Sequence, residues 1–106
     1  MGLPKIITEN INNLNALCKQ HNVNKLYLFG SAATSKFNEE SDIDLIVDIA
    51  ENDPVEKGLL LLNFWDKAEN LFKRKVDLLT EKKFNNPYFY KSIEATKRLI
   101  YERQGA

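Results

Sequence analysis

Residues 26–47 read Leu-Tyr-Leu-Phe-Gly-Ser-Ala-Ala-Thr-Ser-Lys-Phe-Asn-Glu-Glu-Ser-Asp-Ile-Asp-Leu-Ile-Val, and this stretch carries the strongest structural signal in the chain. One apolar run, 26–29, stops at Gly30-Ser31, and a second, 45–47, follows the acidic segment 42–44. Short apolar runs bounded by turn residues are typical of buried β-strands. The stretch therefore predicts two strands, with a Gly-Ser turn and two acidic residues at neighbouring strand ends.

The spacing of the two acids, Asp42 and Asp44, predicts a metal site. Side chains two residues apart in a strand share a face, so both acids point one way while Ile43 and Leu45 point into a core. Two carboxylates on one face repel each other unless a cation lies between them. Because Mg²⁺ prefers oxygen ligands of this kind, we expect a hard divalent ion here.

The Gly30-Ser31 turn predicts phosphate binding. Glycine permits a sharp turn and lets a ligand approach the backbone closely. We expect residues 32–36 to add a short piece of helix, so that the N–H groups around Ser31 open a helix N-terminus, which favours phosphate. The Ser31 hydroxyl can also donate a hydrogen bond to a phosphate oxygen.

The rest of the chain alternates helical and strand patterns. Helical spacing of apolar residues covers 4–20, 54–72 and 87–102, and strand patterns cover 23–29, 43–49 and 75–79. Asp53-Pro54 reads as the N-cap and first residue of the middle helix. This order predicts an α/β fold of the α+β type: a small mixed β-sheet of at least three strands, flanked by three to four helices.

The third predicted strand carries one acid, Asp77, between Val76 and Leu78. A carboxylate in the middle of an apolar strand is unfavourable unless it has a partner. Asp77 is therefore the candidate third carboxylate for the site of Asp42 and Asp44.

The predicted helix 54–72 has an unusually wide apolar surface. One stripe consists of Val55, Leu59, Leu62, Trp65, Ala68 and Phe72, and four further apolar residues widen it. Core packing accounts for most of this surface, and a contact with a partner protein is the alternative.

Composition limits the remaining possibilities. The length of 106 residues suits a single domain, residues 1–106, and 15 basic against 15 acidic residues give no support for strong nucleic-acid binding. No apolar run approaches the roughly 18 residues that span a bilayer, and no secretion signal is present, so we expect a cytoplasmic protein without a membrane segment. We expect Cys18 in the core and His21 at a solvated helix end rather than as a catalytic base.

The combination of Gly30-Ser31 with Ser41-Asp42-Ile43-Asp44-Leu45 resembles the signature of the DNA polymerase beta-like nucleotidyltransferase superfamily. The short chain and the segment Lys75-Val76-Asp77-Leu78 resemble its minimal branch, the MNT proteins, some of which are antitoxins of HEPN toxins. The motif spans residues 26–49, and the order of elements extends the similarity over nearly the whole chain.

The resemblance implies an enzyme of the nucleotidyltransferase fold with a specific set of site residues. Asp42, Asp44 and Asp77 would be the catalytic residues and the ligands of two Mg²⁺ ions, and Asp77 would also activate the attacking hydroxyl. Gly30, Ser31 and Ser41 would bind the nucleoside triphosphate. The implied reaction transfers AMP from ATP to a hydroxyl group, in this branch a tyrosine of a partner HEPN toxin, and so makes the protein an antitoxin.

The sequence departs from the family pattern after Gly30-Ser31. Many members carry arginines there, whereas this chain has Ala32 and Thr34. An arginine could bind triphosphate through two hydrogen bonds, so its loss favours a second hypothesis, a weakly active or non-catalytic antitoxin that acts by binding. A third hypothesis is the nucleotidyltransferase subunit of a two-chain enzyme acting on a small molecule. One of the nearby cations Lys36, Lys73, Arg74 and Lys75 could compensate for the missing arginines, but for each we expect a solvated surface charge.

Overall fold

The computed structural model describes residues 3–30, 37–38, 40–80 and 87–103. Helices and strands follow in the order α1 (Lys5–Glu9), α2 (Ile11–Gln20), β1 (Val23–Phe29), β2 (Ile43–Ile49), α3 (Pro54–Phe72), β3 (Val76–Thr80), α4 (Pro87–Thr96) and β4 (Arg98–Glu102).

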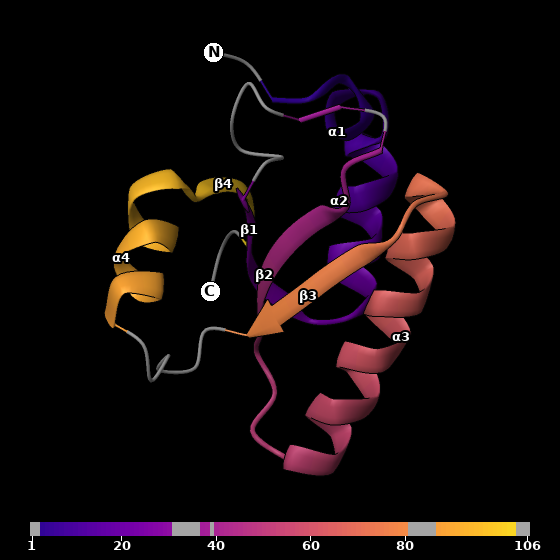
Figure 1. The fold of residues 1–106 in the computed structure, drawn as a ribbon. Coiled ribbons are helices and arrows are strands. Elements are labelled where there is room, and N and C mark those ends of the chain that lie inside the picture. Colours follow the sequence, from indigo (N-terminus) through magenta and orange to yellow (C-terminus); the bar gives the residue numbers. More distant parts are fainter. Residues whose placement is uncertain (1–2, 31–36, 39, 81–86, 104–106) are drawn as a thin grey trace.

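The four strands form one mixed sheet in the order β3-β2-β1-β4, which confirms the predicted fold class. β1 runs antiparallel to both β2 and β4, whereas β2 and β3 are parallel. The parallel pair needs a crossover, and α3 supplies it. Figure 1 shows α2 and α3 on one side of the sheet and α4 on the other.

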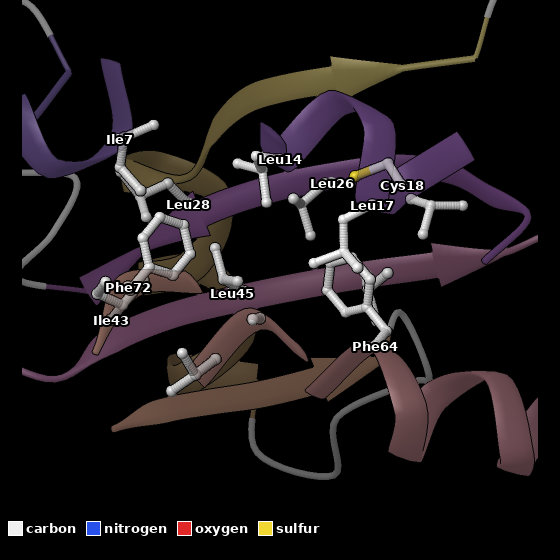
Figure 2. Packing of buried hydrophobic residues seen from close by; sticks show 14 of the residues in the cluster. Ile7, Leu14, Leu17, Cys18, Leu26, Leu28, Ile43, Leu45, Phe64 and Phe72 are labelled. Carbon is white, nitrogen blue, oxygen red and sulfur yellow. The ribbon is translucent and has the colours of Figure 1, made fainter. Parts of the chain in front are cut away.

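The face of the sheet toward α2 and α3 carries the main core (Figure 2). Alternate strand residues such as Leu26, Leu28, Ile43 and Leu45 are fully buried there against both helices. Cys18 belongs to this core, as predicted, and burial raises the pKa of its thiol to about 12. We call this surface of the sheet the covered face.

The opposite surface of the sheet, which we call the open face, has a much smaller apolar cluster. Phe29 and Ile46 pack there against Ile93 of α4, with Tyr27 and Leu79 partly buried at the edge. The alternation of Leu26 and Leu28 with Tyr27 and Phe29 therefore gives β1 two buried faces, as its sequence predicts.

The predicted N-terminal helix, 4–20, is divided into α1 and α2 at Asn10. The backbone of Asn10 leaves the helical region, with φ −111° and ψ 12°. Its side-chain amide donates to the Ile6 carbonyl oxygen at 2.8 Å, which satisfies an acceptor at the end of α1. The prediction of one continuous helix was wrong, because the Asn10 side chain competes with the backbone for this carbonyl.

The predicted C-terminal helix, 87–102, is also wrong in its second half. α4 ends at Thr96 and the chain continues as β4, whose residues Arg98 and Glu102 pair with Leu28 and Lys25 of β1. Without β4, β1 would be an edge strand with apolar side chains on both faces. Pairing therefore favours a strand where the local pattern alone favoured a helix.

α3 begins as predicted, since the Asp53 carboxylate accepts a hydrogen bond from Val55 N at 3.0 Å. The predicted apolar stripe is only partly buried. Phe64, Ala68 and Phe72 face the core, whereas Val55, Leu59 and Leu62 are 69%, 52% and 59% exposed.

His21 is buried and not solvated, which corrects the sequence-based expectation. Its side chain is 4% exposed, its Nδ1 lies 2.8 Å from the Leu17 carbonyl oxygen, and its ring meets Phe64 edge-on. The following residue, Asn22, ends α2 in the left-handed conformation that asparagine tolerates (φ 55°). Among the described residues, no helix is both long and apolar enough to cross a membrane.

Candidate active site

Two of the three predicted carboxylates lie side by side on the open face. Asp44 of β2 pairs in register with Asp77 of β3, and on its other side it pairs with Phe29, the last residue of β1. Their neighbours Ile43 and Val76 also pair, with side chains in the covered core. The alternation of β-strands therefore turns both acids away from that core, as the sequence predicts.

The proximity of the acids changes the chemistry of Asp44. Burial first, then a hydrogen bond with the Asp77 side chain and the negative charges of Asp77 and Asp42, raise the pKa of Asp44 from 3.8 to about 6. A hydrogen bond between two carboxyl groups requires a proton on one of them. The pair is therefore a site where a positive charge would be stabilised.

Gly30 closes the site from the end of β1. Its φ of +65° lies in the left-handed region, where glycine is favoured. A β-carbon at this position would collide with the Asp44 carboxylate, and it would lie 3.2 Å from Asp44 Cγ. The glycine therefore serves two purposes, because it permits the turn and leaves room for the Asp44 side chain.

Asp42 lies just before β2 and is paired with a cation. Its Oδ2 atom is 4.0 Å from Lys75 Nζ, and both side chains are well exposed. At this separation and exposure the pair contributes little to stability. Another cation could therefore displace the Lys75 ammonium from the Asp42 carboxylate.

The predicted phosphate-binding residues are only partly placed. Ser31, like Ala32, Thr34 and Lys36, lies outside the described residues. The Ser41 hydroxyl oxygen accepts a hydrogen bond from Asn38 N at 3.1 Å and so stabilises the turn that precedes Asp42. Its O–H group can still donate.

Arg74 is not the solvated surface charge that the sequence predicts. Its Nη1 atom donates to the carbonyl oxygens of Asn38 and Ser41, both at 2.9 Å. The sequence gives no signal for this contact, because backbone carbonyls more than 30 positions away attract an arginine without any local pattern.

Comparison with known proteins assigns the chain to a family. A family model described as "Polymerase beta, Nucleotidyltransferase" matches residues 12–106. The chain belongs to this nucleotidyltransferase family. It is similar to "Putative protein adenylyltransferase MJ1379" of Methanocaldococcus jannaschii, with 42% identity over 84 residues that cover 77% of this chain and 79% of that protein.

Solved structures share the fold of this nucleotidyltransferase at lower identity. A chain of a toxin–antitoxin crystal structure with AMP-PNP aligns with a TM-score of 0.66 and 20% identity, covering 90% of this chain and 75% of that one. A chain from the complex of a tri-AMPylated Shewanella oneidensis HEPN toxin with an MNT antitoxin aligns with a TM-score of 0.57 and 19% identity, covering 92% and 73%. These similarities show the fold.

The carboxylates of this nucleotidyltransferase are donors of the kind that Mg²⁺ prefers. Within the described part of the chain, no three His, Cys, Asp or Glu side chains already form a group that could hold a metal ion. The pKa of Asp44 is raised by burial and by the neighbouring Asp77 and Asp42, and Asp42 is paired with Lys75. A divalent cation at this point would relieve the repulsion between the carboxylates, and carboxylate oxygens are the ligands that Mg²⁺ prefers.

Proposed function

We propose that this nucleotidyltransferase transfers AMP from ATP to a tyrosine hydroxyl of a HEPN-type toxin, and that it acts in this way as an antitoxin. The observation that carries the proposal is the Asp44–Asp77 pair on the open face beside Gly30. The name of the archaeal relative and the tri-AMPylated toxin in a structure of the same fold support the choice of a protein acceptor.

The proposed roles follow from the positions of the residues. Asp42 and Asp44 would hold the Mg²⁺ ions from the start of β2, and Asp77 would hold one of them from β3. When bound, two such ions supply positive charge to the attacking and leaving oxygens. The triphosphate would lie against Gly30 and Ser31, with the Ser41 hydroxyl as a further donor.

The reaction then needs one proton transfer and one displacement. The acceptor oxygen forms a bond to the α-phosphorus of ATP, while the bond from that phosphorus to the bridging oxygen breaks and pyrophosphate leaves. Asp77 takes the proton of the acceptor hydroxyl, the role that the resemblance assigns to the third acid, and its register with Asp44 places it next to the proposed metal ligands.

The exposed apolar side of α3 is the proposed contact surface for the toxin. Val55, Leu59 and Leu62 recur at helical spacing on a side of α3 turned away from the core, and all three are more than half exposed. In a binding assay, Leu59→Glu should weaken the complex by at least about tenfold, since it places a charge in an apolar contact. Lys67→Glu, which introduces the same side chain at an exposed position outside this surface, is the matched control.

Label transfer tests the function. The chain is incubated with Mg²⁺, ATP labelled on the α-phosphate, and a candidate HEPN-type toxin. Label should appear on a tyrosine of that protein, γ-labelled ATP should give none, and Asp42→Ala/Asp44→Ala should lower the rate by about 10³-fold or more.

Each alternative has its own outcome. A wild-type chain that transfers no label contradicts the proposed activity. If the double variant still neutralises the toxin, the chain is an antitoxin that acts by binding. Pyrophosphate release that depends on a small-molecule acceptor and a second subunit would favour the two-chain enzyme.

A further inference from the structure

The chain just before Asp42 is folded into a tight turn. Ser41 N donates to the Asn38 carbonyl oxygen at 3.1 Å, and Asn38 N donates in return to Ser41 Oγ at 3.1 Å. Glu40 N donates to Asn38 Oδ1 at 2.8 Å. This turn sets the direction in which the backbone enters Asp42.

Arg74 holds both ends of that turn. A single guanidinium nitrogen, Nη1, donates one hydrogen bond to the Asn38 carbonyl oxygen and one to the Ser41 carbonyl oxygen. The same guanidinium group lies over the Phe37 ring, 4.8 Å from its centroid. Phe37 in turn packs against the main core, so the turn is fixed at its first residue as well.

The corner that carries Arg74 is itself rigid. Glu69 Oε2 accepts a hydrogen bond from Val76 N at 3.0 Å, and Trp65 Nε1 donates to the Val76 carbonyl oxygen at 2.7 Å. These contacts tie the last turns of α3 to the start of β3. Arg74 therefore extends from a fixed corner to a turn that would otherwise depend on its own local hydrogen bonds.

We propose that Arg74 is a positioning residue of the active site. By fixing Asn38 and Ser41, it sets the direction in which the Asp42 carboxylate enters the site before any ligand arrives, so that less conformational freedom is lost when metal and nucleotide bind. The role rests on the proposed function, because the site that Arg74 positions is the one proposed to bind MgATP. A lysine could not replace it fully, since one ammonium cannot both bridge two carbonyls and stack on an aromatic ring in the same geometry.

Three variants test this role. Arg74→Met removes the donors and keeps a long apolar side chain over Phe37, and Arg74→Lys keeps the charge. Lys73→Asn is the matched control, because it removes the same charge from the neighbouring exposed residue, whose left-handed backbone (φ 54°) asparagine tolerates. Urea unfolding establishes that each variant is folded. If Arg74→Met does not fold, Arg74→Lys still tests the role.

Two measurements separate positioning from simple stabilisation. Hydrogen exchange at the Glu40 and Ser41 amides reports on the turn, and calorimetric titration with Mg²⁺ and α,β-methylene-ATP, which cannot be cleaved at the reacting bond, reports on the site. Arg74→Met should exchange at least about tenfold faster and bind the analogue about tenfold more weakly, with Arg74→Lys between it and the wild type. Lys73→Asn should match the wild type in both.

The outcomes are distinguishable. If Arg74→Met binds the analogue as tightly as the wild type does, Arg74 only stabilises the turn and the positioning role is overturned while the proposed function stands. If Lys73→Asn weakens binding equally, the effect is one of general charge, and the role is again overturned. If the wild type does not bind the analogue, the proposed function fails and the positioning role fails with it.

Discussion

The two faces of the sheet differ in how completely they are covered. On the covered face, α2 and α3 bury a continuous core that contains every inward-pointing residue of β2 from Ile43 to Ile49. On the open face, the buried cluster of described residues is small, and the same strand carries Asp44 and Asp48. A charge on the covered face would lose its solvation without compensation, so the acids of β2 lie on the open face, which is less completely buried. The proposed active site thus lies where packing is incomplete.

The largest expected effect is on the covered face. Phe64→Ala should lower the free energy of unfolding by about 3–5 kcal/mol, because the fully buried Phe64 ring leaves a cavity between α3 and the sheet. Ile93→Ala, in the smaller cluster of the open face, should cost about 2 kcal/mol. Urea unfolding of both variants measures the contrast, and equal losses would mean that the two faces contribute alike.

Glycine substitutions test how tightly the edge of the open face is packed. Gly30→Ala should lower stability by about 1–2 kcal/mol through its positive φ, and should also weaken metal binding by displacing the Asp44 carboxylate. Gly58→Ala is the control, because a β-carbon there meets no atom within 4 Å. That variant should gain about 0.5–1 kcal/mol from helix propensity. Thermal unfolding and metal titration of the two variants measure these effects. A Gly30→Ala variant with unchanged stability and unchanged metal binding would contradict the account.

The smallest expected effect comes from the raised pKa of Asp44. Because the pKa of Asp44 is raised to about 6 in the folded state, its contribution to stability is present below about pH 4 and is lost as the pH rises through 6. Without divalent ions, Asp44→Asn should therefore be more stable than the wild type at pH 7.5, by about 1 kcal/mol once solvent screening is allowed for. At pH 4 the difference should nearly vanish. Urea unfolding in the presence of a chelator at pH 7.5 and pH 4 measures this stability difference. A difference that does not change with pH would contradict the prediction.

The sequence predicts well the features that depend on alternating residues in strands and on turn residues. Strands 23–29 and 43–49, the start of α3 at Asp53-Pro54 and the shared face of Asp44 and Asp77 all follow from local pattern. Alternation decides which face each strand residue occupies, and the fold then decides which strands are neighbours.

The features that the sequence does not predict depend on distant partners. β4 forms because β1 needs a second neighbour, and Arg74 turns to carbonyls across the site. His21 is buried because Phe64 of another helix covers it. Val55, Leu59 and Leu62 are exposed because the core-facing side of α3 is set by contacts with the sheet and α2, which apolar spacing alone does not specify.

The most direct test of the central claim is whether the acids of the open face bind a divalent cation. Mn²⁺, a hard oxygen-seeking ion that electron paramagnetic resonance detects, is titrated into the wild type and into Asp44→Asn, Asp77→Asn and Asp48→Asn. Asp48 is the matched control, because it lies on the same face of β2 and its carboxylate accepts a hydrogen bond from Asn24 at 3.0 Å. The wild type and Asp48→Asn should bind Mn²⁺ alike, and Asp44→Asn and Asp77→Asn should each bind at least about tenfold more weakly. Unchanged Mn²⁺ binding by Asp44→Asn and Asp77→Asn would contradict the account.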